Sequence, residues 1–295
     1  MTASSTVGAM LRTTEERLKR GGIASFRAEA ETLLAALLRK SRTQLLTDIG
    51  CVISGEQCDD LNDWLARRTD GEPLQYIVGT TGFHHLELEV GAGVLVPRPE
   101  TEILVEAALR IVSSRKGLVR VLDIGTGSGN IALSLAYAHS SIHVVGVDRS
   151  ADALRMARRN LARLALDERV EFQEGDLFDA LRDYQNDRRF DLIVSNPPYI
   201  ASADLVTLPR DVRDFEPHFA LDGGPDGLSV IRRLIAQAPS HLHPGGWLIF
   251  EIGQGQAKDA LSLLCPALGW TQTDVLQDLC GVERVILARF RGAEN

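Results

Sequence analysis

The sequence predicts an α/β protein in which a small helical domain precedes a doubly wound, mostly parallel β-sheet. Two observations carry this prediction. The first 75 residues repeat apolar side chains at helical spacing, and from about residue 98 strands alternate with helices. Such alternation places helices on both faces of a parallel sheet. The chain has 295 residues, 44% of them hydrophobic, which is enough for one large domain with a smaller partner.

The predicted N-terminal helical domain covers residues 1–75. A first helix ends before Gly21, and a second repeats apolar residues at helical spacing between Ala30 and Leu38. A third helix is expected to begin at Ser54, because Ser54 and Gln57 have the spacing of a capping box. The segment carries no obvious chemistry of its own, so we expect it to dock a substrate or to pack on the rest of the chain.

Residues 76–97 are predicted to form a β-hairpin linker. Apolar and polar residues alternate over 85–90, which is the period of a half-buried strand. Gly91 and Gly93 permit a turn, after which residues 94–96 are expected to form the second strand of the hairpin.

The remaining residues, 98–295, alternate between helix and strand. The expected strands are 119–124, 143–147, 170–173, 190–195, 247–252, 269–275 and 283–289. The expected helices pass through 103–107, begin near 128, span 151–164, begin near 227 and span 257–264. No helix separates the last two strands, so one of them should run antiparallel to the others.

Composition narrows the possible functions. The formal net charge of −8 argues against a protein that holds duplex nucleic acid through its phosphates. The four cysteines form no CxxC pair and the seven histidines have no ligand spacing, so no metal is expected. Residues 1–13 lack the pattern of a secretory signal, and no run of eighteen apolar residues occurs. We therefore predict a cytoplasmic, reduced protein without membrane contact, and we expect a monomer.

A glycine-rich turn is the strongest local motif. An apolar strand runs into the turn and a helix follows, an arrangement that lets the backbone approach a ligand closely. The residues expected to bind a cofactor there are Gly125, Thr126, Gly127, Ser128 and Gly129. The next strand ends in Asp148, nineteen residues beyond Gly129, where a carboxylate can accept hydrogen bonds from both ribose hydroxyls.

Spacing favours S-adenosyl-L-methionine over a dinucleotide as the cofactor. The turn reads Gly-x-Gly-x-Gly and lacks the third glycine at the position that the dinucleotide fingerprint requires. After the third strand, Asp176 is expected to accept a hydrogen bond from the adenine amine. Leu177 and Phe178 are expected to provide apolar cover for the adenine ring. Seven strands suit the class I, Rossmann-like methyltransferase fold, and the product would be S-adenosyl-L-homocysteine.

The reacting group is expected at Asn196-Pro197-Pro198-Tyr199, directly after the strand 190–195. Ligands of doubly wound sheets gather at the carboxyl ends of the strands. The prolines donate no N–H, which leaves carbonyls free to accept. The Asn196 side-chain oxygen and the Pro197 carbonyl would each accept one hydrogen bond from a conjugated NH₂ group of the substrate, and Tyr199 would pack on its planar face.

Together these motifs resemble the PrmC/HemK family of protein-(glutamine-N5) methyltransferases, which act on peptide chain release factors. The resemblance spans the chain, and its motifs are Glu72–Gly79, Val96–Glu102, Gly125–Gly129, Asn196–Tyr199, Phe215–Pro217, Leu221–Gly224 and Glu251–Gly253. It implies that the substrate is the glutamine of a Gly-Gly-Gln loop. It also implies that the glycine turn, Asp148, the position of Leu177 and Asn196 bind the cofactor, while Asn196 to Tyr199 hold the glutamine.

Two other functions remain open from the motifs alone. An N6-adenine methyltransferase of DNA or RNA also acts on a conjugated amine, and Asn-Pro-Pro-Tyr by itself does not separate the two substrates. The acidic charge and the Pro-Arg-Pro-Glu-Thr-Glu segment at 97–102 argue against it. A non-catalytic scaffold would be expected to lack Asn196 or Asp148, and both residues are present.

Overall fold

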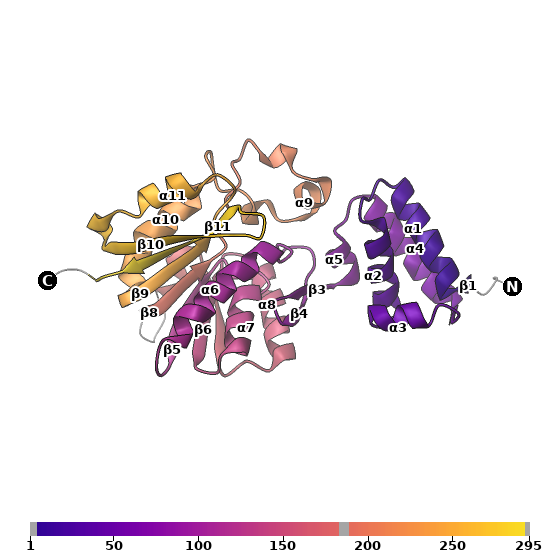
Figure 1. The fold of residues 1–295 in the computed structure, drawn as a ribbon, viewed down its shortest axis with the longest axis horizontal. Coiled ribbons are helices and arrows are strands. Elements are labelled where there is room, and N and C mark those ends of the chain that lie inside the picture. Colours follow the sequence, from indigo (N-terminus) through magenta and orange to yellow (C-terminus); the bar gives the residue numbers. More distant parts are fainter. Residues whose placement is uncertain (1–4, 183–188, 293–295) are drawn as a thin grey trace. The chain divides into compact units, whose positions relative to one another are not determined.

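The computed structural model describes residues 5–182 and 189–292, and the chain forms two compact units. The N-terminal unit comprises Met1–Thr80 together with Pro209–Phe215, and the C-terminal unit comprises Thr81–Leu208 and Glu216–Asn295. Figure 1 traces the elements of each unit along the chain. A short segment from the second half of the sequence therefore belongs to the N-terminal unit. The separate linker over 76–97 stays a prediction.

The N-terminal unit is helical, as predicted. Its elements are β1 (Ser5–Thr6), α1 (Val7–Arg20), α2 (Phe26–Leu38), α3 (Arg42–Thr47), β2 (Val52–Ile53), α4 (Gly55–Thr69), α5 (Leu74–Val78) and α9 (Arg210–Phe215). Both hydrogen bonds of the predicted capping box form between Ser54 and Gln57 at the start of α4. Helix α3 was not predicted, although Ser41 and Gln44 form a second capping box there. Leucines of α1, α2 and α4 fill the core of this unit.

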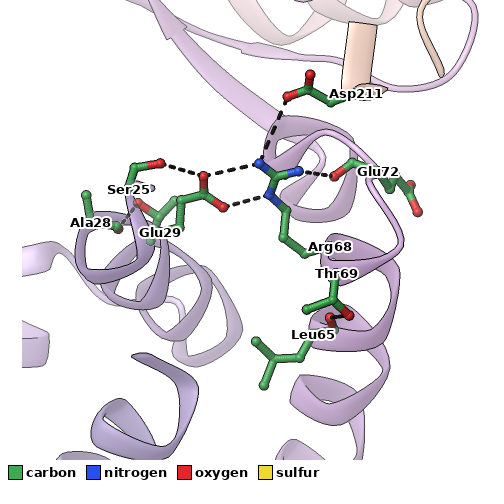
Figure 2. Close-up of polar contacts among 9 residues, drawn as sticks. Ser25, Ala28, Glu29, Leu65, Arg68, Thr69, Glu72 and Asp211 are labelled. Atoms are coloured by element: carbon green, nitrogen blue, oxygen red, sulfur yellow. Dashed lines mark hydrogen bonds and ion pairs between the residues drawn. The ribbon is translucent and has the colours of Figure 1, made fainter. Parts of the chain in front are cut away.

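A buried ion pair joins α2 to α4 in this unit (Figure 2). The Arg68 guanidinium donates to both carboxylate oxygens of Glu29, at 2.7 and 3.3 Å, and each side chain is only 10% exposed. Arg68 also donates to the Glu72 carbonyl at 3.1 Å, and Ser25 donates to Glu29. Asp211 of α9 lies 4.0 Å from the same guanidinium, so this arginine contacts the segment that returns from far along the sequence.

We expect Arg68→Ala to destabilise the N-terminal unit by about 3–5 kcal/mol, because it leaves the Glu29 carboxylate buried without its charged partner. Hydrogen exchange at the amides of α2 and α4 measures the loss locally. The paired variant Glu29→Leu with Arg68→Met removes both charges and should recover most of that stability. Equal destabilisation by the single and paired variants would contradict this account.

The C-terminal unit is built on a seven-stranded sheet with the order β10-β11-β9-β8-β5-β6-β7. The strands are β5 (Val119–Ile124), β6 (Ile142–Asp148), β7 (Val170–Glu174), β8 (Phe190–Ser195), β9 (Leu242–Glu251), β10 (Trp270–Gln277) and β11 (Glu283–Phe290). β11 runs antiparallel to both of its neighbours, and the other pairings of the sheet are parallel. The predicted fold class is confirmed, including the single reversed strand.

Helices cover both faces of the sheet (Figure 1). They are α6 (Glu102–Ser113), α7 (Asn130–Ala138), α8 (Ala151–Leu164), α10 (Ser229–Gln237) and α11 (Ala257–Leu263). The short 3₁₀ turns are Pro99–Thr101, Leu177–Leu181, Leu205–Thr207, His218–Ala220, Ala238–His241 and Pro266–Leu268. Alternate strand residues enter two separate apolar cores, one under α6, α7 and α8 and the other under α10 and α11.

The hairpin before this sheet differs from the prediction. Strand β4 (Leu86–Glu89) lies where alternation placed it, but its partner is β3 (Thr80–Phe83), and residues 94–96 form no strand. The turn lies at His84, which adopts a left-handed conformation with φ 52°. Glycine is the residue that usually marks a left-handed turn in a sequence, and this turn has a histidine instead. The prediction of a turn at Gly91 and Gly93 was therefore wrong. Val94 instead packs with Val90 in a small apolar cluster.

Candidate active site

A cavity of about 360 Å³ lies at the carboxyl ends of β5, β6 and β8. Predicted site residues that line it are Gly125, Gly127, Asp148, Asp176, Leu177, Asn196 and Pro198. A hollow of about 480 Å³ lies at the opposite ends of the strands, beside Arg120 and Glu171, and contains none of them. Because ligands of doubly wound sheets bind at the carboxyl ends, the first cavity is the candidate site.

The glycine turn bends tightly under this cavity. Gly125, Gly127 and Gly129 have φ values of 75°, 57° and 84°, a region that side chains rarely adopt. A Cβ at Gly127 would meet no protein atom within 4 Å, which leaves room for a ligand against the backbone. Thr126 and Ser128 are buried beneath the turn instead of lining the cavity. The turn thus offers backbone, not side chains, to a cofactor.

A buried carboxylate that the sequence analysis did not single out fixes the turn from below. Asp123 accepts from the Thr126 hydroxyl at 2.6 Å and from the Ala132 amide at 3.2 Å. Burial is the main cause that raises the pKa of Asp123 to about 7, and the two hydrogen bonds oppose that rise. An acidic residue between the apolar Leu122 and Ile124, just before the glycine turn, was the available signal.

Asp148 ends β6 at the cavity wall, as predicted. Its two carboxylate oxygens accept from the backbone amides of Gly127 and Ser150, each at 2.9 Å. A carboxylate has about four lone-pair sites, so acceptors remain for two ribose hydroxyls. Burial raises the pKa of Asp148 above its ordinary value, against these hydrogen bonds. Together with the open space at Gly127, this acceptor fits the nucleoside of S-adenosylmethionine.

Of the three residues predicted to contact the adenine ring, two line the cavity and one does not. Asp176 lines the cavity but also forms an ion pair of 2.8 Å with Arg233. Leu177 lines the cavity in a left-handed backbone conformation with φ 52°. Phe178 does not line it, because its ring is buried and stacks on His241 with centroids 4.6 Å apart. The aromatic side chain at the cavity is Phe219, which the sequence analysis missed.

The Asn196–Tyr199 segment follows β8 directly. The Ser195 hydroxyl donates 2.7 Å to the Ile124 carbonyl, which ties the ends of β8 and β5 together. Asn196 and Pro198 line the cavity, whereas Pro197 is buried. Tyr199 is half-buried, and its carbonyl accepts from Gln256 at 2.8 Å. The predicted segment therefore lies beside the predicted cofactor residues.

A buried network holds the two ends of this segment. The Asn196 amide nitrogen donates to Thr101 Oγ1 at 3.0 Å, and Thr101 Oγ1 lies 2.6 Å from Glu251 Oε2. The Tyr199 hydroxyl donates to Glu251 Oε1 at 3.1 Å. Thr101 belongs to the Pro-Arg-Pro-Glu-Thr-Glu stretch, and Glu251 ends β9. Neither Thr101 nor Glu251 was predicted to have a role in the site.

A second ion pair connects two other motifs of the same unit. Arg98 donates to both carboxylate oxygens of Glu216 at 2.8 and 2.7 Å, and the Glu216 side chain is only 2% exposed. Glu216 begins the part of the C-terminal unit that contains Phe219. These stretches, far apart in the chain, therefore meet near the cavity wall.

The buried carboxyl groups Asp123 and Glu251 give the folding stability a defined pH dependence. Burial is the main cause that raises the pKa of Glu251 from 4.5 to about 7, and that of Asp123 from 3.8 to about 7. The folded state then holds these protons more tightly than the unfolded chain. Their ionisation therefore lowers the free energy of unfolding as the pH rises from about 4 to about 7, with no further change above that range.

Thermal unfolding of wild type and Glu251→Gln across this range measures the effect. The melting temperature of the variant relative to wild type should rise as the pH increases through the window. A difference that stays constant with pH would contradict the assigned direction.

In the described part of the chain no helix is long and apolar enough to span a membrane, and no group of three His, Cys, Asp or Glu side chains could hold a metal ion.

The chain is similar to known methyltransferases over most of its length. The family described as a methyltransferase domain matches residues 115–268, and the PrmC N-terminal domain matches residues 9–79. A release factor glutamine methyltransferase of Geobacter sulfurreducens is 42% identical over 97% of this chain and 97% of its own. One from Pseudomonas aeruginosa is 44% identical over 90% of this chain and 93% of its own.

A solved structure is also similar, that of a release factor-specific protein-(glutamine-N5) methyltransferase from Alicyclobacillus acidocaldarius. It is 32% identical, covers 69% of this chain and 99% of its own, and has a TM-score of 0.42. The identity of the two full-length relatives over nearly all of the sequence decides the assignment. The chain belongs to the family of release factor glutamine methyltransferases.

Proposed function

We propose that this chain transfers the methyl group of S-adenosyl-L-methionine to the side-chain amide nitrogen of the glutamine in the Gly-Gly-Gln loop of a peptide chain release factor. One observation carries the proposal at the level of the site. Asn196, which follows β8, lines the same cavity as the glycine turn and Asp148. The names of the relatives support the substrate.

Bound S-adenosyl-L-methionine supplies an electrophilic methyl carbon on a positively charged sulfur. The residues of the chain bind and orient the two reactants. The turn at Gly125 and Gly127 and the carboxylate of Asp148, which line the cavity, would hold the nucleoside end of the cofactor. Fixing two reactants in line can lower a barrier by about 7–11 kcal/mol, so positioning alone supplies a large share of the catalysis.

The glutamine amide is a weak nucleophile, because its nitrogen lone pair is delocalised into the carbonyl group. Its two N–H donors must both be placed if the nitrogen is to face the methyl carbon. In this proposal the Asn196 side-chain oxygen accepts one and the Pro197 carbonyl accepts the other. These acceptors would also stabilise the positive charge that grows on the nitrogen during transfer. The N–H proton is then lost to solvent water, which leaves a neutral N-methyl amide and S-adenosyl-L-homocysteine.

The N-terminal unit has a different part in the proposal. It contains no predicted site residue, and its helices form a core of their own. We assign it the docking of the release factor, with residues 76–97, which contain the β3–β4 hairpin, as the linker between it and the methyltransferase domain. The enzyme acts as a monomer in the cytoplasm, where its proposed substrate works in translation termination, and it needs no nucleic acid or membrane.

Transfer of a labelled methyl group to a purified release factor tests the function. Mass spectrometry should find one added methyl group on the glutamine of the Gly-Gly-Gln loop. A release factor with that glutamine replaced by alanine is the matched control and should accept none. Label that enters adenines of duplex DNA or RNA, and not the release factor, would overturn the proposal in favour of an N6-adenine methyltransferase.

A further inference from the structure

We propose that Thr101 and Glu251 are positioning residues that fix the orientation of the Asn196 side-chain amide, so that its oxygen is the atom offered to the substrate. The inference rests on the proposed function, since it assigns the direction of the hydrogen bond that holds the glutamine. It is carried by the buried chain of contacts from Glu251 through Thr101 to Asn196.

Above its pKa of about 7 the Glu251 carboxyl group is ionised, and an ionised carboxylate only accepts hydrogen bonds. Glu251 is 1% exposed, and its two oxygens lie 2.6 Å from the Thr101 hydroxyl and 3.1 Å from the Tyr199 hydroxyl. Both hydroxyls must therefore point their protons at Glu251.

The Thr101 side chain is fully buried. A hydroxyl group has one proton and two lone pairs. Because Thr101 gives its proton to Glu251, it can only accept from Asn196. The 3.0 Å contact between Thr101 and Asn196 must then be made by the amide NH₂ group.

The Asn196 side-chain amide has an NH₂ end and an oxygen end, and a half-turn about the last side-chain bond exchanges them. In the exchanged orientation the amide oxygen of Asn196 would face a lone pair of Thr101 Oγ1, and the two oxygens would repel each other. Thr101 therefore holds the NH₂ group on its own side. The locked orientation leaves the Asn196 oxygen as an acceptor, which suits a substrate that presents N–H donors.

Glu251 also ties the far end of the segment. Its second oxygen holds the Tyr199 hydroxyl, while the Tyr199 carbonyl is held by Gln256. A Cβ at Gly227 would lie only 2.3 Å from the Tyr199 carbonyl oxygen, so the backbone has no room to shift on that side. One carboxylate thus sets the direction of Asn196 and the position of Tyr199 together. Neither Thr101 nor Glu251 lines the cavity, so they act through these neighbours.

The test uses the full-length protein and near-isosteric variants at a pH well above about 7, where Glu251 is ionised. Glu251→Gln places an NH₂ donor where the network needs an acceptor, and Thr101→Val removes the hydroxyl. Each should lower kcat for release factor methylation by about 10- to 100-fold, the scale expected when an aligned group is misplaced. The Kd for S-adenosylmethionine from calorimetry should change less than about two-fold. Thr101→Ser keeps the hydroxyl and should restore most of the rate lost in Thr101→Val.

A second readout needs no turnover. The side-chain amide signal of Asn196, assigned by its absence in Asn196→Ala, should show slow proton exchange in wild type. Glu251→Gln and Thr101→Val should lose that protection and Thr101→Ser should keep it. If wild type methylates no release factor, the proposed function fails, and this signal still decides the orientation.

The inference would be overturned by an unchanged Asn196 signal in both variants, or by wild-type kcat in either. It would also be overturned if kcat, cofactor affinity and melting temperature fell together, since that pattern indicates a merely structural role.

Discussion

Asn196→Ala should lose methyl transfer to the release factor by about 100-fold or more, because a misplaced reacting group alone can cost that factor. The variant keeps the glycine turn and Asp148, which line the same cavity. Its calorimetric Kd for S-adenosylmethionine should therefore stay within a few-fold of wild type. Single-turnover kinetics with saturating cofactor measures the transfer step directly.

The control for this variant is Gln272→Ala, which removes an exposed amide from the edge strand β10 and should leave the rate unchanged. Near-normal transfer by Asn196→Ala would remove Asn196 from the mechanism. A large loss of cofactor affinity would mean that its main contact is with the cofactor instead of the acceptor amide.

Asp148→Ala should weaken binding of the cofactor, whereas Asn196→Ala should slow the transfer step. Loss of charge-assisted hydrogen bonds to the ribose is expected to cost about 1.5–3 kcal/mol, a factor of roughly 10 to 100 in the Kd for the cofactor. Part of the loss will come through the turn, since Asp148 also accepts from the Gly127 amide. Isothermal titration calorimetry with S-adenosyl-L-homocysteine measures it.

Asp148→Asn keeps one carbonyl oxygen as an acceptor, so its affinity should fall between wild type and Asp148→Ala. Asp274→Asn, on the exposed face of β10, removes the same charge far along the sheet and should bind normally. Unchanged affinity in Asp148→Ala would count against a ribose contact at this position.

The sequence by itself determined the parts whose signals are local. The structure has the predicted bounds for the strands 119–124 and 190–195 and for the helix 151–164. A run of apolar residues predicts each of these strands, and a helical repeat of apolar residues predicts the helix. The glycine turn, Asp148 and Asn196 were found for the same reason, since each lies at the end of such a strand. Parallel strands bring their carboxyl ends to one edge, so local motifs sufficed to place these residues around one cavity.

Only the tertiary structure decided which distant residues meet. Thr101 lies 150 positions from Glu251 and 95 from Asn196. No periodic pattern of residues in the sequence predicts contacts between positions so far apart. The same holds for Pro209–Phe215, which joins the N-terminal unit. Phe178 enters the core whereas Phe219 lines the cavity, since packing, not residue type, sets the direction of a ring. A chain encodes its elements in short patterns, but the contacts that orient a reactive side chain arise when those elements pack.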